Sequence, residues 1–412
     1  MAEILTLQCS ICGKNYSDTM MYTCPSCGEV GTLDVLYDYT NLSDYQTAIT
    51  NSNVFSMWRY KPLLPLEQDS VFPPLRVGFT PLYDAPRLAK TLGIKQVWVK
   101  DDGLNPTGSL KDRASSLVVA RALEQNISIV TTASTGNAAA ALAGVAASVG
   151  MRPIIFVPAA APEAKIAQLL VYGAIVLLVE DSYDVAFDLC MKISQQEGWY
   201  CRNTGVNPFT TEGKKTVAYE IAEQLNWQVP DAIVVSVGDG NIIAGVYKGF
   251  YDLVQMGWIQ RIPRLIGVQS STSAPLVNAW QHNMNAVDMQ PIMAHSIADS
   301  IVAGLPRDRS KALRAVNQTD GAFIAVDDSE ILQAIPQFAR LTGVFAEPAA
   351  AAAWAGAQRA RSLGLLHADE QVVILSTGSG LKDVRRAQES VAQGIHVKPD
   401  IKSIKSALQE LI

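Results

Sequence analysis

Four of the six cysteines lie within the first 27 residues, as two Cys-x2-Cys pairs. Cys9 and Cys12 form the first pair, and Cys24 and Cys27 form the second, with eleven residues between the pairs. In a chain without a recognisable export signal, such pairs indicate a zinc site rather than disulfides. Four protein ligands leave no open coordination position, so we expect one structural Zn²⁺ here. The alternative is a turn-rich region with reduced thiols and no metal.

Lys111 lies in the segment NPTGSLKDR, residues 105–113, where a helix is expected to begin. A Walker A loop needs its lysine immediately after the second glycine, whereas two other residues follow Gly108 here, so that type of phosphate loop is excluded. The helix dipole and partial burial lower the pKa of a lysine in this position, as an imine-forming lysine requires. The alternative is a surface lysine that pairs with Asp112.

Three further turns rich in glycine and hydroxyl side chains each follow a predicted strand. ASTGNAAA, residues 133–140, fits either an ordinary helix N-cap or a cradle for a carboxylate. VSVGDGNIIAG, residues 235–245, fits a phosphate cup, but the four residues between Gly240 and Gly245 exclude the dinucleotide fingerprint. STGSGLKD, residues 376–383, is the last of the three. Each turn alone is also typical of a tight strand-to-helix connection.

The elements that must position these turns are short apolar strands that alternate with amphipathic helices. Strands are predicted at residues 96–100, 128–132, 153–157, 175–179, 232–237, 264–269 and 372–376. Helices are predicted at residues 138–149, 162–172, 183–196 and 213–226. The strands are rich in β-branched residues and do not alternate, which favours parallel strands buried on both faces. The sequence therefore predicts an α/β fold whose ligands bind beyond the carboxyl ends of the strands.

In chain order, PTGSLKDR, STGN, the GDGN loop and STGSG resemble the fold-type II pyridoxal-phosphate-dependent enzymes of the tryptophan synthase β-like superfamily. TGSGLKD and the four-cysteine segment most resemble the threonine synthase family, and the resemblance extends from about Cys9 to Asp383. It implies two open, twisted parallel-sheet domains with pyridoxal 5'-phosphate in the cleft between them, preceded by a small four-cysteine zinc-ribbon-like element. The implied activity is that of a lyase that converts O-phospho-L-homoserine and water to L-threonine and phosphate.

On this basis the chain is expected to have five parts. They are a zinc-ribbon-like element (1–38), an irregular arm (39–78), a large cofactor-binding domain (79–105 and 206–395), a smaller domain with the Schiff-base lysine and the carboxylate loop (106–205), and a C-terminal helical tail (396–412). The small domain is thus inserted into the large one.

The resemblance also implies a role for each motif. Lys111 forms the Schiff base with the cofactor, Asn137 contacts its 3'-oxygen and Thr377 faces its pyridine nitrogen. The cofactor phosphate binds the loop formed by Gly238, Asp239, Gly240 and Asn241. The small amino-acid substrate contacts Ser134, Thr135, Gly136 and Thr204. A hydroxyl at the ring nitrogen, in place of a carboxylate, leaves the pyridine largely unprotonated and favours elimination from the β or γ carbon.

Two positions do not fit this pattern smoothly. Asp239 places an acid beside a phosphate, so its side chain must point away or bond to loop N–H groups. The segment NTGVNPFTTEGKKT, residues 203–216, resembles NSxNPxRxEGQKT, whose arginine helps to bind the substrate phosphate, but Thr210 holds that position here. The nearest cations are Lys214 and Lys215, and Lys214 is equally consistent with a solvated surface position. A missing bidentate cation lowers the affinity of a phosphate site.

Thr210 therefore leaves other activities open. One is a β-replacement enzyme that resembles cysteate synthase, and another is an ammonia-lyase that resembles serine/threonine dehydratase. Outside enzymes, the alternative is a binding or regulatory protein whose ribbon docks a partner. An absorbance band of an imine-bound cofactor would separate these classes.

Composition narrows the possible partners. The net charge of the 412 residues is −6, which argues against a general binder of nucleic acid or of anionic membranes. The first residues lack a basic stretch followed by an apolar one, so a cytoplasmic location is expected. Only 17% of the residues are charged, which indicates a large core and a surface covered by a second subunit. We therefore expect a homodimer, with the tail as a candidate contact.

Overall fold

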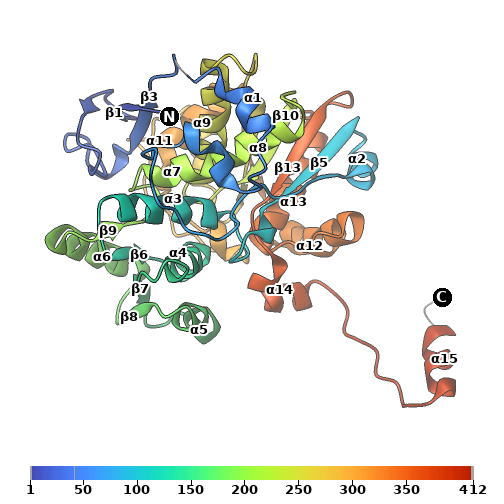
Figure 1. Ribbon diagram of the computed structural model, residues 1–412. Coiled ribbons are helices and arrows are strands. Elements are labelled where there is room, and N and C mark those ends of the chain that lie inside the picture. Colours follow the sequence, from blue (N-terminus) through green and yellow to red (C-terminus); the bar gives the residue numbers. More distant parts are fainter. Residues whose placement is uncertain (1, 41, 410–412) are drawn as a thin grey trace.

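A computed structural model describes residues 2–40 and 42–409 of the protein, and within them the strands form three sheets (Figure 1). The first sheet is antiparallel, with the order β2-β1-β3. Its elements are β1 (Ile4–Cys9), β2 (Asn15–Tyr16), the 3₁₀ turn η1 (Gly28–Val30) and β3 (Leu33–Tyr37). Cys9 ends β1, and the other three clustered cysteines lie in the turns between these strands.

The predicted irregular arm contains two short helices, α1 (Tyr45–Thr50) and the 3₁₀ helix η2 (Met57–Leu63). Arg59 of η2 donates two hydrogen bonds to Glu223 of α8 (Thr216–Gln224), at 3.0 and 2.5 Å. Met57 and Tyr60 are fully buried beside this ion pair. The arm is therefore a packed part of the body.

The largest sheet has six strands in the order β12-β11-β10-β13-β5-β4. Their bounds are β4 (Leu82–Asp84), β5 (Gln96–Asp101), β10 (Ala232–Ser236), β11 (Arg264–Ser270), β12 (Ala322–Val326) and β13 (Gln371–Ser376). The helices that follow these strands are α2 (Pro86–Leu92), α9 (Asn241–Gln255), α10 (Pro275–Gln281), α11 (Arg309–Asn317), α12 (Asp328–Thr342), α13 (Pro348–Ser362) and α14 (Val384–Glu389). Short 3₁₀ turns complete it: η3 (Asp102–Leu104), η4 (Asp299–Ile301) and η5 (Gly380–Lys382). The central strands are buried on both faces, as their apolar sequences require.

The third sheet is parallel, with the order β8-β7-β6-β9. Its strands are β6 (Val130–Ala133), β7 (Ile154–Pro158), β8 (Ile175–Val179) and β9 (Tyr200–Cys201). Its helices are α3 (Lys111–Glu124), α4 (Asn137–Ala147), α5 (Glu163–Val171) and α6 (Tyr183–Glu197). Figure 1 shows these elements grouped below the N-terminal sheet and apart from β13 and β5.

Four sequence predictions need correction. The largest sheet is mixed, because β4 pairs antiparallel with β5. The apolar strand β8 is an exposed edge, with Ile175 41% and Leu178 52% accessible, so it is not buried on both faces. The helix predicted at residues 213–226 begins earlier and is split into α7 (Phe209–Lys214) and α8. Finally, β4, β9 and β12 were not predicted at all.

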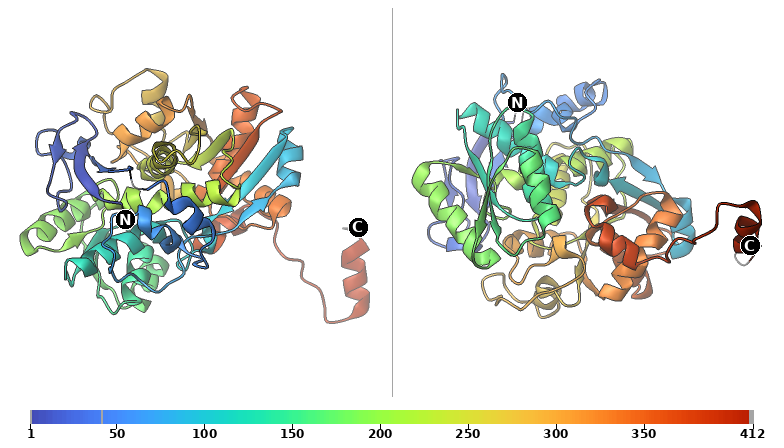
Figure 2. Two further views of the ribbon diagram at one scale, coloured as in Figure 1. Left: turned by 45° about the horizontal axis from the view of Figure 1, so that its top comes forward. Right: turned by 90° about the horizontal axis from the view of Figure 1, so that it is seen from below.

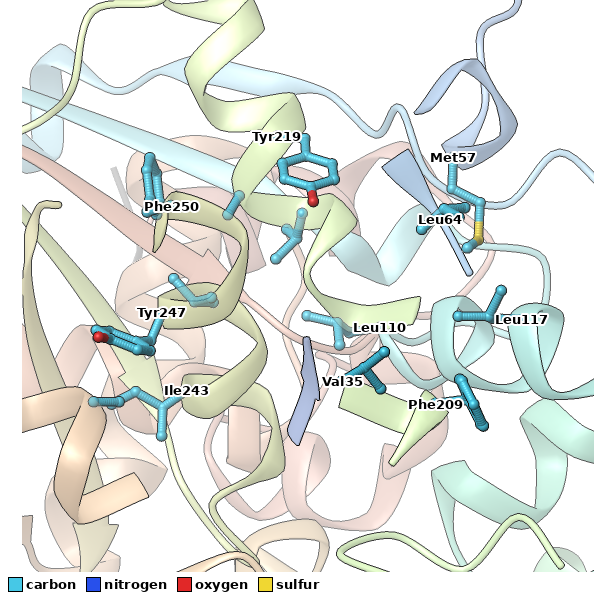
Figure 3. Close-up of a cluster of buried hydrophobic side chains, with 14 of the residues drawn as sticks. Val35, Met57, Leu64, Leu110, Leu117, Phe209, Tyr219, Ile243, Tyr247 and Phe250 are labelled. Atoms are coloured by element: carbon cyan, nitrogen blue, oxygen red, sulfur yellow. The ribbon is translucent and has the colours of Figure 1, made fainter. Parts of the chain in front are cut away.

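The main hydrophobic core contains residues from the regions of all three sheets. Leu110, Leu117 and Phe209 pack between α3 and α7, and Ile243 and Phe250 of α9 continue the same cluster (Figure 3). Residues of the N-terminal sheet and of the arm, among them Val35, Met57 and Leu64, enter the cluster as well. The residue just before Lys111 is therefore anchored in the core, which fixes where the lysine emerges.

The C-terminal helix α15 (Ile401–Gln409) lies away from the body at the end of an extended segment (Figure 1, Figure 2). None of its described residues is buried, and even the apolar side chain of Ile401 is 73% accessible to solvent. Of the helical tail predicted at residues 396–412, residues 401–409 are helical and residues 396–400 are not, and residues 410–412 lie outside the described residues. No helix in the described chain is long and apolar enough to cross a membrane.

Candidate active site

Lys111 is the first residue of α3 and faces a cleft. The turn before it requires Gly108, whose φ of 82° is left-handed. The turn is tied to the loop after β13, because Leu110 N–H donates to Thr377 O at 3.0 Å and Ser379 N–H donates to Gly108 O at 2.9 Å. Two of the four predicted motifs are therefore in direct contact.

Asp112 does not pair with Lys111, so the surface ion-pair interpretation is wrong. The Asp112 carboxylate is buried and instead accepts a hydrogen bond from Thr107 N–H at 2.7 Å. Burial lowers the pKa of Lys111, with Arg202 contributing, while the negative charges of Glu347 and Asp239 oppose the shift. A lysine with a lowered pKa is a better nucleophile and base near neutral pH.

The loop from Ser134 to Gly136 connects β6 to α4 and leads directly into Asn137. Asn203, which follows β9, holds the end of β6 in place: its Oδ1 accepts hydrogen bonds from Ala133 N–H at 2.7 Å and from Thr132 Oγ1 at 3.0 Å. This brings the loop to the N-terminus of α4, where free N–H groups favour an anion.

The loop Gly238–Asn241 connects β10 to α9 and has no room for larger side chains. A Cβ on Gly240 would lie 2.7 Å from Ala312 Cβ, and the residue has a φ of 88°; a Cβ on Gly238 would lie 2.9 Å from Ile301 Cα. The backbone N–H groups of residues 238–241 have no acceptor within the described chain. The side chain of Asp239 does not occupy these N–H groups, because its Oδ1 accepts a hydrogen bond from the N–H of Arg307 at 3.3 Å. The loop therefore offers a ring of free donors at a helix N-terminus, which suits a phosphate.

One cavity of about 670 Å³ brings these motifs together. Ten of the eleven predicted cofactor and substrate residues line it: Lys111, Ser134, Thr135, Gly136, Asn137, Thr204, Gly238, Asp239, Gly240 and Asn241. Thr377 is the exception. It lies immediately behind the lining, with its Oγ1 3.5 Å from Oγ of Ser236 in the cavity wall. A cavity of this size suits a cofactor together with a small substrate.

Glu347 is a site residue that sequence reasoning missed, because Glu347-Pro348 is also an ordinary helix start. Its carboxylate does not cap α13 but accepts hydrogen bonds from Asn137 Nδ2 at 2.9 and 3.0 Å. Burial raises the pKa of this carboxyl, and Asn137 and Lys111 only partly counter the shift. Glu347 is outside the lining of this cavity and holds the amide of Asn137, which lines it.

Several buried polar atoms without a hydrogen-bond partner belong to residues within two positions in sequence of residues that line the cleft or, for Ser376, next in sequence to Thr377. Among the described residues they include Ser109 Oγ, Arg202 Nη2, Asn203 Nδ2, Asp308 Oδ1 and Ser376 Oγ. Each such atom in a native protein needs an explanation, and a bound polar group is one. Together with the free loop N–H groups and an amine without a bonded partner, they fit pyridoxal phosphate.

The four N-terminal thiols also converge. The Sγ atoms of Cys9, Cys12, Cys24 and Cys27 all lie within 4.8 Å of one another. Cys12 Sγ and Cys24 Sγ are 3.8 Å apart, and a tetrahedral ion with Zn–S bonds of about 2.3 Å separates its sulfurs by about 3.8 Å. Cys190 and Cys201 are buried elsewhere, as predicted.

Thiol acidity in this cluster is uneven. Burial alone would raise the pKa of Cys24, but hydrogen bonds from Tyr16 and from backbone N–H groups lower it to about 6. Cys12 raises the pKa of Cys27 to about 12. A bound cation would be needed for all four thiols to be ionised together.

Comparison with known proteins agrees with this geometry. Residues 74–378 match the family described as pyridoxal-phosphate dependent enzyme. Among solved structures, the processed threonine deaminase isoform 2 of Solanum lycopersicum superposes with a TM-score of 0.66 at 20% identity, covering 90% of this chain and 96% of the other. A fungal L-serine ammonia-lyase from Rhizomucor miehei gives 0.63 at 24% identity over 75% and 98% of the two chains. At these identities the structures establish the shared fold. The fold, the cleft and the family match together place the chain among the pyridoxal-phosphate-dependent enzymes.

Curated relatives are more specific. The chain is 38% identical to the threonine synthase of Methanocaldococcus jannaschii over 98% of its own length and 99% of the relative's. It is 38% identical to the threonine synthase of Methanosarcina acetivorans over 98% of both, and 36% identical to that of Synechocystis over 85% and 89%. The chain belongs to the threonine synthase family.

Proposed function

We propose that the protein converts O-phospho-L-homoserine and water to L-threonine and phosphate with pyridoxal 5'-phosphate as cofactor. The observation that carries this proposal is the convergence of Lys111, the carboxylate loop and the free N–H groups of the glycine loop on one cavity. The near full-length similarity to threonine synthases supports the choice of substrate.

Residues of the cleft wall would hold the cofactor. Lys111 would bind it covalently through Nζ, the N–H groups of residues 238–241 would bind its phosphate, and Thr377 would lie near its ring nitrogen. Bound in this way, the cofactor supplies an electron-withdrawing ring that acidifies the carbon beside the substrate nitrogen. Asn137 is held by Glu347 and would orient the ring oxygen from the side.

The chain's own residues would then position the substrate and move its protons. Ser134, Thr135 and Gly136, with the N-terminus of α4, would hold the substrate carboxylate. Lys111 Nζ would accept the proton of the α carbon and release it before it accepts one from the β carbon, and at the end it would return a proton to the α carbon; its lowered pKa leaves a fraction of it neutral for these transfers. Phosphate leaves from the γ carbon, and water supplies the hydroxyl at the β carbon and a proton at the γ carbon, so that atoms balance.

The deciding assay is product analysis of the purified holoprotein with four substrates: O-phospho-L-homoserine, L-serine, L-threonine and O-phospho-L-serine. We expect threonine and phosphate in equal amounts from the first substrate. Phosphate without threonine, or a keto acid and ammonia from serine or threonine as the main reaction, would reject the synthase in favour of an ammonia-lyase. A sulfonated product from O-phospho-L-serine and sulfite would indicate a cysteate-synthase-like enzyme.

The four-cysteine cluster is proposed to hold one structural Zn²⁺ in a ribbon-like unit. Its support is the convergence of four thiols at sulfur distances that suit a tetrahedral ion. Metal analysis of wild type should find zinc close to one equivalent, and Cys9→Ser and Cys24→Ser should lose it. Equal metal content in all three proteins would remove the zinc site.

A homodimer in the cytoplasm completes the proposal. Two apolar surfaces support the dimer: the face of α15 that carries Ile401, Ile404 and Leu408, and the exposed edge strand β8. Sedimentation of the full chain should give twice the subunit mass of 44.4 kDa. A single-subunit mass at micromolar concentration would contradict the dimer.

A further inference from the structure

Five basic side chains of the described chain have no exposure to solvent: Lys100, Arg113, Arg202, Lys214 and Lys215. Lys100, Arg113 and Lys215 each have a carboxylate oxygen close by, at 2.7, 2.5 and 2.6 Å. No acidic side chain of the described residues forms an ion pair with Arg202 or Lys214. A buried, unpaired cation is expensive, so these two positions call for an anion from outside the chain.

The guanidinium of Arg202 is only partly bonded. It follows β9, its Nε donates to Ser115 Oγ at 3.2 Å and its Nη1 donates to Thr204 Oγ1 at 2.6 Å. Nη2 has no partner. Thr204 itself lines the cleft. Because Thr204 Oγ1 already accepts a bond, its own hydrogen is free to donate to an anion in the cleft, with the guanidinium directly behind it.

Lys214 lies in the wall of the same cavity. Its Nζ donates to Oδ1 of Asn241, the residue that closes the glycine loop. Burial lowers the pKa of Lys214 well below its ordinary range, and the positive charges of Arg202 and Lys111 lower it further. Lys111 and Lys214 in the cleft wall and Arg202 behind Thr204 therefore repel one another, and a dianion bound in the cleft would relieve that repulsion.

The cofactor phosphate does not account for Arg202. That phosphate is assigned to the N–H groups of residues 238–241, whereas Arg202 and Thr204 follow a strand of the other sheet. Thr210 also offers no cation: it is fully buried, and its hydroxyl donates to Asn207 O at 2.7 Å. Arg307 also lines the cleft, but it is paired with Glu29 at 2.7 Å, so Arg202 is the arginine left for a second phosphate in the cleft.

We infer that Arg202, acting with Thr204 and Lys214, binds the phosphate of a phosphorylated amino-acid substrate, in the role that the family gives to an arginine at the position of Thr210. The inference rests on the proposed function for the identity of that substrate. Arg202 binds the substrate phosphate, and Lys214 adds positive charge beside the glycine loop. The cation for the leaving phosphate is thus at position 202 in this chain and not at position 210.

The test compares holoenzyme of wild type with Arg202→Met and Arg202→Lys. We expect Arg202→Met to raise both the KM for O-phospho-L-homoserine and the Ki of inorganic phosphate by about 10- to 100-fold, the loss of one charge-assisted hydrogen-bonding group. Arg202→Lys should recover part of both, because it restores charge but not two parallel donors. Cofactor content and its absorbance should stay as in wild type.

Two controls separate binding from structure. L-Homoserine, which lacks the phosphate, should inhibit wild type and Arg202→Met with equal Ki. Arg121→Met removes another buried arginine, near the C-terminal end of α3, and should leave both KM and phosphate Ki unchanged. If Arg202→Met shifts the homoserine Ki as much as the phosphate Ki, its effect is structural and the inference is wrong.

The inference and the proposed function fail in different ways. If wild type forms no threonine, inorganic phosphate binding to the holoenzyme still reports on Arg202 through the thermal midpoint. If wild type forms threonine and folded Arg202→Met keeps a wild-type KM and phosphate Ki, the inference is overturned while the function stands. If Arg202→Met does not fold, the two Ki values are compared in Arg202→Lys instead. A rise in the Ki of phosphate without a rise in the Ki of homoserine supports the inference, and an equal rise in both overturns it.

Discussion

Two groups of buried charge differ in one respect, which is whether the protein supplies the counter-ion. In the first group, Arg113 bonds to Asp102 at 2.6 and 2.8 Å and to Glu220 at 2.5 and 2.8 Å, and Lys100 pairs with Glu220 at 2.7 Å. In the second group, Lys111 and Lys214 line the cleft with Arg202 behind Thr204, and no ion pair joins any of the three to an acid of the described chain.

The difference assigns different roles to similar side chains. The paired group connects α3 to η3 and to α8 two residues after Lys111, so it fixes the lysine in place. We expect the unpaired group to contribute little to stability and to serve binding instead. Removing a charge should therefore damage stability in the first group and activity in the second.

The largest expected effect is on catalysis. Lys111→Ala should lower the turnover of O-phospho-L-homoserine by more than about 1,000-fold, because it removes the proposed covalent attachment point and the proposed base together. The free energy of unfolding, measured in urea, should not fall, since an unpaired amine leaves the cleft. The visible absorbance band of the holoprotein should disappear. Retention of that band with wild-type activity would end the assignment of Lys111.

The second prediction tests the comparison directly. Arg113→Met leaves Asp102 and Glu220 without their shared partner and should lower the free energy of unfolding by about 3–5 kcal/mol. Arg202→Met removes an equally buried arginine but strands no acid, so its change should stay within about 1 kcal/mol. Urea unfolding of the two variants side by side gives the answer. An equal loss of unfolding free energy in the two variants would show that both groups of charge stabilise the fold.

Acid should weaken the paired group next. Burial alone would raise the pKa of Glu220, but Arg113 and Lys100 outweigh burial and lower it from 4.5 to about 2. The stabilisation from this group is complete above pH 4.5 and is lost as pH falls towards 2, because only the unfolded chain takes up the proton in that window. This loss amounts to about 3 kcal/mol.

The measurement is the free energy of unfolding between pH 5 and pH 2.5 in wild type and in Glu220→Gln. The variant is less stable throughout, but its slope against pH should be shallower by about one proton. An unchanged slope would show that Glu220 is already protonated or unpaired in the native state.

The sequence predicted those features of the fold that depend on local patterns. Apolar runs located seven strands, and the order of the loop motifs placed ten residues on one cavity wall. It missed β9 because a strand of two residues exists only through its pairing with β6. It also predicted β8 as buried, because an apolar run does not reveal that its sheet ends there.

Arg202 and Glu347 were missed for a related reason. Each has an ordinary local role, after a strand or at a helix start, and its importance depends on partners far away in the chain. Whether a buried charge is paired is a property of the whole fold, and sequence spacing does not show it.

The smallest expected effect concerns Thr210, and it separates the position of a residue in a motif from its role. Thr210→Val keeps the shape of the side chain and removes one buried hydrogen bond to Asn207 O. The free energy of unfolding should fall by about 1 kcal/mol. The KM for O-phospho-L-homoserine should stay within about twofold of wild type, because a loss of charge-assisted binding at Arg202 is worth far more than that. Steady-state kinetics with Arg202→Met as the paired variant makes the contrast. A tenfold higher KM in Thr210→Val alone would show that the hydroxyl at position 210 still serves the phosphate, and that the cation has not moved to Arg202.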